Sequence, residues 1–302
     1  MPSNDKNKGL IELLLAMIMM GTVGLFVIES GQNAYNVVFY RCLLGSVFLL
    51  IYCLASKKFS DSQLTARNLM LIIASGIFLV FNWALLFESF KVASISTSTT
   101  IYHTQPFFFL IIWSVIFKEK TEKSKLFWML IAFVGVALVA DLAQTYDSLS
   151  FAQLWGTLLA LSAAVLWALS AVLVKFLSQI SPFIVTLIQL VVGIFVLFPF
   201  AELQTVGTIT PTQWACLVTL GLVHTCLTYV LMYSSYKKLP ASTIAIMTFI
   251  YPAVAIFIDY QFYDQSLNGF QIAGIFMIFL SSYASTQNLK FPFKLFSRQE
   301  TQ

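Results

Sequence analysis

Polar and aromatic side chains interrupt the long apolar stretches of this sequence at a few positions. His103 and Gln105 stand just before Pro106, and His224 lies in a second apolar stretch. A polar group in an apolar environment destabilises the fold unless it is paired or hydrated, so each residue is a candidate for function. Hydrogen-bonding groups beside ring faces suit the reversible binding of a polar solute. The candidate binding residues are His103, Gln105, Tyr251, Tyr102, Asn82, Trp83, His224, Tyr229 and Thr248.

A structural interpretation competes with the binding role at every one of these positions. A single histidine in a helix is more often a hydrogen-bonded packing residue than a ligand. His103 and His224 stand at a similar depth in the two halves of the chain, and this recurrence favours binding. Pro106 and Pro252 each remove a backbone donor in the middle of an apolar stretch, so they predict either a static kink or a hinge.

Two charged residues, Arg41 and Glu88, also fall inside apolar stretches. Their positions predict a similar depth, so we expect them to meet as an ion pair. One interpretation is a structural pair that joins two helices, since an unpaired buried charge is costly. The other is a functional role, in which the pair acts as a gate or Arg41 holds a carboxylate of the substrate.

The sequence lacks the residue patterns that metal sites, disulfide frameworks, enzyme active sites and nucleic-acid-binding surfaces require. Cys42, Cys53, Cys216 and Cys226 match the spacing of neither a zinc site nor a disulfide framework. Nothing resembles a nucleophile, a metal site or a phosphate-binding loop, so we expect no enzyme activity, no metal and no cofactor. The lysines are scattered and form no single basic face, which argues against nucleic acid as a partner.

The elements that position these residues are membrane-spanning helices. The sequence is 59% hydrophobic and 10% charged, with a mean hydropathy of +0.86, whereas a soluble domain carries about a quarter charged residues. Apolar runs of about 20 residues cross a bilayer, and about ten such runs follow one another. They are Leu10 to Ile28, Asn36 to Ala55, Leu69 to Phe90, Ile95 to Phe117, Leu126 to Ala143, Ala152 to Lys175, Pro182 to Phe200, Gln213 to Tyr236, Ala241 to Ile258 and Asn268 to Gln287.

The basic residues predict the orientation of these spans. If the amino terminus is cytoplasmic, Lys91 is the one basic residue between spans on the outer side, which agrees with the positive-inside rule. An even number of spans then places both termini in the cytoplasm. The residues on the inner side are Lys6, Lys8, Lys57, Lys58, Arg67, Lys118, Lys120, Lys123, Lys125, Lys175, Lys237, Lys238, Lys290, Lys294 and Arg298.

The second half of the chain repeats features of the first. Pro106 aligns with Pro252 at an offset of 146 residues, and Gly45 with Gly193 and Gly76 with Gly221 follow at nearly the same offset. Five spans per half is an odd number, so the second half must insert upside down, as in many secondary transporters. We expect one five-helix repeat over residues 10–143, a second over 152–287, and cytoplasmic tails over 1–9 and 288–302.

These features resemble the drug/metabolite transporter superfamily, and among its members the EamA-like transporters, over Leu10 to Gln287. Three residues depart from the family pattern: Gln189 stands where an arginine would repeat, Met20 where a tryptophan is common, and Gln265 where Glu119 would repeat. The resemblance is carried by Phe39 to Gly45 with Arg41 inside it, by the proline-centred span that runs into Phe117 to Lys120, by Gly135, and in the second half by Trp167 to Ser170, Pro252 and Gly274.

The resemblance implies an all-α carrier that moves a small metabolite, amino-acid-like or amphipathic, across the cell inner membrane by alternating access. Export is the expected direction, and uptake or exchange by the same fold is the alternative, followed by a channel or structural subunit. The expected partners are the solute and the lipid bilayer. A coupled ion or exchanged solute and a homodimer stay open.

Overall fold

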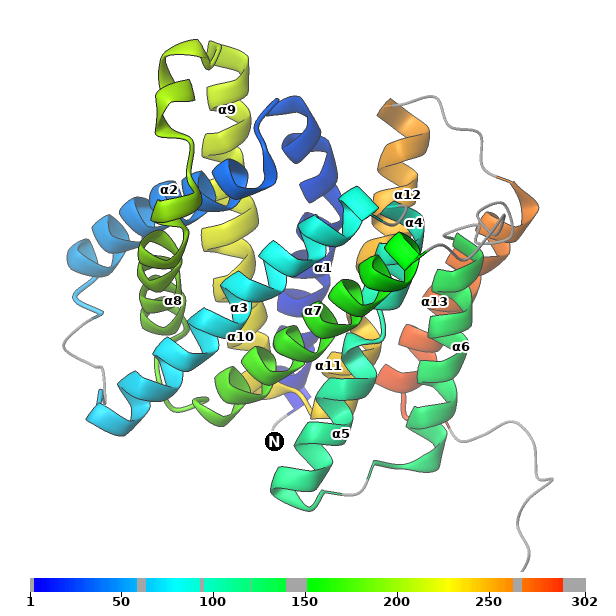
Figure 1. Ribbon diagram of the computed structural model, residues 1–302. Helices are drawn as coiled ribbons and strands as arrows, with labels where there is room; N and C mark the ends of the chain where they lie inside the picture. Colours follow the sequence, from blue (N-terminus) through cyan, green and yellow to red (C-terminus); the bar gives the residue numbers. More distant parts are fainter. Residues whose placement is uncertain are drawn as a thin grey trace, which may run out of the picture.

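The computed structural model describes residues 3–58, 64–92, 95–119, 121–139, 151–262 and 268–289, and every regular element among them is helical. Helices α3 and α7 run side by side through the middle of the bundle, while α6 with α13 and α2 with α8 form opposite flanks (Figure 1). The helices are α1 (Ser3–Glu29), α2 (Ala34–Ala55), α3 (Ala66–Val92), α4 (Ile95–Tyr102), α5 (Gln105–Phe117), α6 (Lys123–Val139), α7 (Phe151–Phe176), α8 (Pro182–Leu197), α9 (Pro211–Thr219), the π-helix η4 (Leu220–Leu227), α10 (Thr228–Lys238), α11 (Ala241–Met247), α12 (Ile250–Phe262) and α13 (Gly269–Thr286).

The composition of these helices suits a bilayer. Nine helical segments of the described residues are long and apolar enough to cross a membrane. Large apolar side chains remain exposed on the outside of the bundle, among them Phe195 at 77% and Val115 at 72%, and lipid is the solvent that tolerates such a surface. The predicted span Leu126 to Ala143 corresponds to α6, which has 17 residues and ends at Val139. Residues 140–143 lie outside the described residues.

The main contacts between a helix of the first half and a helix of the second have counterparts in which the two halves change roles. Helix α3 packs on α7 as α1 packs on α10, and α5 packs on α7 as α1 packs on α12. Helix α2 packs on η4 as α3 packs on α8, while α2 pairs with α8 and α6 pairs with α13. Reciprocal contacts of this kind are those of two similar units related by an approximate two-fold axis.

Two glycines allow α6 and α13, which are equivalent helices of the two halves, to pack closely together. A Cβ atom on Gly135 of α6 would lie 2.8 Å from the carbonyl oxygen of Gly274, and one on Gly274 of α13 would lie 2.5 Å from that of Gly135. Small residues let helix backbones approach one another in membranes, where apolar side chains gain little by leaving lipid. The backbones of α6 and α13 therefore touch directly.

Two equivalent spans are broken in their middle. Helix α4 ends at Tyr102 and α5 begins at Gln105, while α11 ends at Met247 and α12 begins at Ile250. A proline follows each break, and since proline has no N–H and its ring crowds the preceding turn, the regular hydrogen bonding cannot continue.

Threonine hydroxyls replace part of the lost bonding at the breaks. The Oγ1 of Thr104 donates to the carbonyl of Ile101 at 2.6 Å, and that of Thr248 donates to the carbonyl of Ala245 at 2.7 Å. The sequence predicted a kink or a hinge at Pro106 and Pro252, and the structure has a break just before each proline.

The span that follows α9 contains a stretch of π-helix, which the sequence did not predict. Along η4 the hydroxyls of Thr225 and Thr228 donate to the carbonyls of Leu220 and Val223, each five residues earlier, at 2.7 and 2.9 Å. A π-turn holds more residues than an α-turn, so it rotates the side chains that follow it relative to those before it.

Candidate substrate site

The two helix breaks bring His103 and Tyr251 together in the interior of the bundle. The ring centroids of the two residues lie 4.7 Å apart. His103 is 1% exposed, and neither of its ring nitrogens has a hydrogen-bond partner in the part of the chain that the structure describes. Gln105 is also buried, its Oε1 is likewise without a partner there, and its side chain interacts with Tyr251. Buried polar atoms without partners are rare in folded proteins and are common where a ligand supplies the partner.

Tyrosines from several helices lie near this contact. Tyr102 adjoins His103, with 6.3 Å between ring centroids, and it is close enough to Tyr229, Tyr236 and Tyr251 for electrostatic interaction. Tyr102 donates to the Oδ1 of Asn82 at 3.2 Å, and the Nδ2 of Asn82 donates to the carbonyl of Ala163 at 2.7 Å, which ties α4 through α3 to α7. The cluster is therefore formed by both halves of the chain. Tyr236 was not predicted, because nothing in its local sequence separates it from other interfacial tyrosines.

Arg41 lies at the other side of the same cluster. Its Nε donates to the Oγ1 of Thr225 at 2.9 Å, and its guanidinium carbon lies 4.9 Å from the centroid of the Trp83 ring. Trp83 in turn contacts Tyr229 edge to face, with 5.9 Å between ring centroids. Arg41 is 2% exposed. Ring contacts therefore join the guanidinium through Trp83 to Tyr229 of the second half.

The described contacts give Arg41 and Glu88, which were expected to form an ion pair, different partners. Among the residues that the structure describes, Arg41 is held by Thr225 and Trp83, while Glu88 accepts a hydrogen bond from the hydroxyl of Tyr35 at 2.5 Å. Glu88 lies five residues beyond Trp83 on α3, about 7.5 Å further along the helix axis. This rise brings Glu88 level with Tyr35 and takes it away from Arg41.

No role was predicted for Gln189, the residue of α8 that stands near the position equivalent to Arg41 in the second repeat. Its Nε2 donates to the Oγ of Ser75 at 2.8 Å, and its Oε1 accepts from the hydroxyl of Tyr233 at 2.7 Å. Arg41 contacts η4 and α3, and Gln189 contacts α3 and α10, so the two residues make related contacts in the two halves. A single amide in the apolar run of α8 was the signal that could have found it.

Two of the predicted site residues are placed differently. The Nε2 of His224 shares a hydrogen bond of 2.9 Å with the Oγ1 of Thr22, and its ring lies 4.8 Å from that of Phe26. These contacts bind His224 to α1 and do not involve His103. The hydroxyl of Thr248 is used at the break in its own span. Both residues are therefore held by contacts within the protein.

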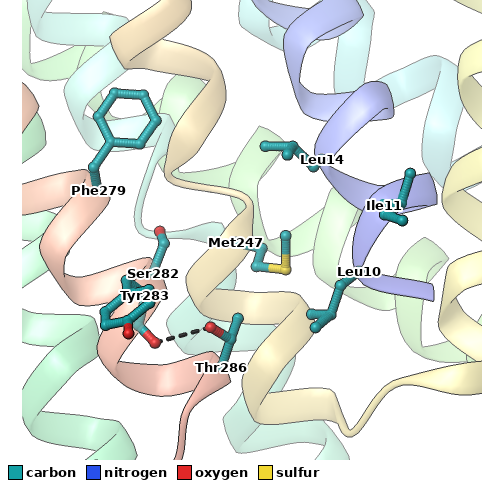
Figure 2. Close-up of a pocket in the computed structure, with 8 residues that line it drawn as sticks. All are labelled: Leu10, Ile11, Leu14, Met247, Phe279, Ser282, Tyr283 and Thr286. Carbon is teal, nitrogen blue, oxygen red and sulfur yellow. Dashed lines mark hydrogen bonds between the residues drawn. The ribbon is translucent and has the colours of Figure 1, made fainter. Parts of the chain in front are cut away.

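A groove on the outside of the bundle does not contain the cluster. Figure 2 shows side chains of α1, α11 and α13 that line this groove, and its volume is about 270 Å³. Several of its side chains are exposed on the outside of the bundle, such as Ile11 at 59% and Tyr283 at 60%. A groove of this kind faces lipid, and none of the candidate binding residues lines it. Its lining residues are Leu10, Ile11, Leu14, Met247, Phe279, Ser282, Tyr283 and Thr286.

One end of the bundle is held by charged side chains. Lys238 of α10 forms an ion pair with Glu12 of α1 at 2.5 Å, and the Nζ of Lys6 donates to the carbonyl of Thr286 at 3.1 Å. The Nζ of Lys175 donates to the carbonyl of Leu239 at 2.8 Å. These contacts tie α1 of the first half to α10 and α13 of the second, and they place the described beginning and end of the chain at the same end of the bundle.

Comparisons with known proteins agree with this architecture. The model of the EamA-like transporter family matches residues 7–140 and 154–287. The uncharacterized transporter YxxF of Bacillus subtilis strain 168 is 31% identical over 279 residues, which cover 92% of this chain and 89% of the relative. An uncharacterized transporter of Archaeoglobus fulgidus is 26% identical over 266 residues, which cover 88% of this chain and 92% of the relative.

The fold is also shared with a protein of known crystal structure. The two chains superpose with a TM-score of 0.79 at 14% sequence identity, over 95% of this chain and 98% of the other. Since the family model covers both halves, the chain belongs to the EamA-like transporter family of the drug/metabolite transporter superfamily, and it is a multi-pass membrane transporter.

Proposed function

We propose that the protein is a secondary transporter that exports a small metabolite, amino-acid-like or amphipathic, across the cell inner membrane by alternating access. The observation that carries this proposal is the meeting of two equivalent broken spans at one buried polar cluster, where His103 contacts Tyr251 at 4.7 Å. Discontinuous helices that meet between repeats are a common way to build the substrate site of a secondary transporter.

The proposed topology is ten spans in two inverted repeats, over residues 10–143 and 152–287, with both termini in the cytoplasm. Helix α6, the fifth span in chain order, completes the ten together with the nine described segments that are long and apolar enough to cross a membrane, because it packs along α13. The contact of Lys6 with Thr286 supports an even number of crossings, since it joins the first helix to the last at one end of the bundle. The lysine distribution supports the cytoplasmic assignment of that end.

In this mechanism the two halves rock around the cluster. His103 and Gln105 offer hydrogen-bonding atoms to the solute, and Tyr251 offers a ring face and a hydroxyl. At the breaks before Pro106 and Pro252 the regular helical hydrogen bonding is already interrupted, so α4 and α5, and α11 and α12, can change their mutual angles more easily than the two parts of an unbroken helix. An ion gradient or an exchanged solute supplies the free energy of transport.

Transport by inside-out membrane vesicles tests the proposal. Labelled amino acids and related metabolites are offered to vesicles with and without the protein, and an exported solute accumulates in a saturable way. Unlabelled solute on the far side should accelerate the flux of the labelled solute, because a carrier that returns with bound solute exchanges one molecule for another. Flux that neither saturates nor responds to far-side solute would identify a channel, and uptake in right-side-out vesicles alone would reverse the proposed direction.

A further inference from the structure

We propose that Arg41 binds a carboxylate group of the transported solute, so that the substrates are small monocarboxylic metabolites. This inference rests on the proposed function and specifies its substrate class. Its basis is a buried positive charge that the described part of the protein does not neutralise.

The charge of Arg41 lacks an acidic partner among the described residues. No contact of Arg41 with a carboxylate is found among the described residues; two of the carboxylates on neighbouring helices have other partners, since Glu12 is paired with Lys238 and Glu88 is hydrogen-bonded to Tyr35. Arg41 itself meets a neutral hydroxyl and an aromatic ring. A guanidinium is charged at any physiological pH, and its burial without a counter-ion is strongly unfavourable. An anionic ligand would remove this penalty.

The contacts of Arg41 also leave its binding atoms available. A guanidinium has five N–H donors, and in the described part of the chain the Nε alone forms a hydrogen bond. The hydroxyl of Thr225 gives its own proton to the carbonyl of Leu220, so it serves Arg41 as an acceptor. Thr225 and the ring of Trp83 therefore fix the guanidinium in place, while the two Nη groups keep the paired geometry that binds carboxylates.

The second repeat provides an internal comparison. Gln189 occupies the related position, and both its donor and its acceptor ends are used by Ser75 and Tyr233. A neutral amide therefore suffices at the related position of the second repeat. Arg41 differs from Gln189 in its charge and in its incomplete hydrogen bonding.

Aromatic side chains that could contact the rest of the solute lie beside the guanidinium. From Arg41, the ring of Trp83 leads to Tyr229, whose hydroxyl interacts electrostatically with those of Tyr102 and Tyr251. His103 lies against Tyr251. A solute with a carboxylate at one end and a polar or aromatic group at the other would contact Arg41 and this cluster together.

A ligand-stability assay with the purified full chain tests the inference. The probes are L-amino acids, 2-hydroxy acids and simple monocarboxylates, each compared with its uncharged carboxamide, and the readout is the melting temperature as a function of probe concentration. At least one acid should bind the parent at least about tenfold more tightly than its amide, as expected for a paired charge-assisted contact. Arg41→Gln should reduce that preference to about one, and Arg41→Lys should retain part of it.

Gln189→Leu is the matched control, because it removes the related polar group from the other repeat. It should lower the melting temperature without changing the preference for acid over amide. Amides that bind as well as acids, a panel in which no acid stabilises the parent, or an Arg41→Gln protein that keeps the preference would each overturn the inference. An acid that binds in this way but is not carried across vesicles would leave the carboxylate site intact and refute the transport proposal.

Discussion

The imidazole of His103 and the phenol ring of Tyr251 are in contact, 4.7 Å apart between centroids, although they belong to different halves of the chain. Each residue lies next to the break in its own span, so a change of angle at either break alters this contact. The contact thus couples the two elements that have to move if the halves rock against each other.

Replacement of either residue should therefore affect transport more than folding. His103→Ala and Tyr251→Ala are expected to keep the melting temperature near that of the parent while reducing transport at least several-fold, a loss of about 1–2 kcal/mol at the rate-controlling step. Vesicle transport and thermal unfolding of the same preparations measure the two effects. Cys53→Ala, a buried change on α2 outside the cluster, is the control. Transport that falls only in proportion to protein yield would assign both residues to packing.

Several parts of this arrangement could be predicted from the sequence. The apolar runs predicted the spans because the bilayer sets their length, and Pro106 and Pro252 predicted where two spans are interrupted because proline cannot continue a helix. The offset between these prolines also predicted that the two spans would be equivalent. The spans, their interruptions and their equivalence could be predicted because each follows from residue types and spacings along the chain.

The side-chain directions could not be predicted in the same way. His224 was a candidate binding residue together with His103 because both stand at a similar depth, but depth does not determine which way a side chain points around its helix axis. The π-turns of η4 change that direction for the residues they contain, and His224 is directed to Thr22 of α1. Partners such as Ser75 for Gln189 depend on the packing of α3 against α8, which no local pattern encodes.

The ion pair between Glu12 and Lys238 should contribute to stability, since its side chains are only 12% and 20% exposed. Glu12→Gln and Lys238→Met each leave one charge without its partner, and each is expected to cost about 1–3 kcal/mol in unfolding free energy. The double variant should lose less than the sum of the two. Denaturant unfolding in detergent measures all three, and strictly additive losses would mean that the two charges do not interact in solution.

The direct contact of α6 with α13 predicts a steep dependence on side-chain size. Gly135→Ala introduces a Cβ atom 2.8 Å from the carbonyl oxygen of Gly274, so the two helices must separate. We expect a loss of about 1–3 kcal/mol, as for overpacked cores, and a lower melting temperature. Gly24→Ala is the control, because nothing lies within 4 Å of its added Cβ atom and alanine favours the helix. Equal stability of the two variants would show that α6 and α13 are not in close contact.

The orientation of the bundle can be tested with reporters that are active only in the cytoplasm. A reporter fused after Gln302 should be active, and one inserted at Gln144 should be silent, because the lysine distribution predicts that the termini lie inside and the connection between the halves outside. The readout is the fluorescence or enzyme activity of the reporter, compared between fusions that are expressed at the same level. The reverse pattern would overturn both the orientation and the inverted arrangement of the repeats.

The separate partners of Arg41 and Glu88 predict that the two residues act independently. Arg41→Gln and Glu88→Gln should change the unfolding free energy additively, within about 0.5 kcal/mol, because they share no partner among the described residues. Arg41→Gln and Thr225→Val should instead be coupled, since Thr225 accepts the hydrogen bond from the Nε of Arg41 at 2.9 Å. Two double-mutant cycles on the purified protein measure both couplings. If the Glu88 cycle gave the larger coupling, Arg41 would approach Glu88 in solution and would no longer be available to a carboxylate ligand.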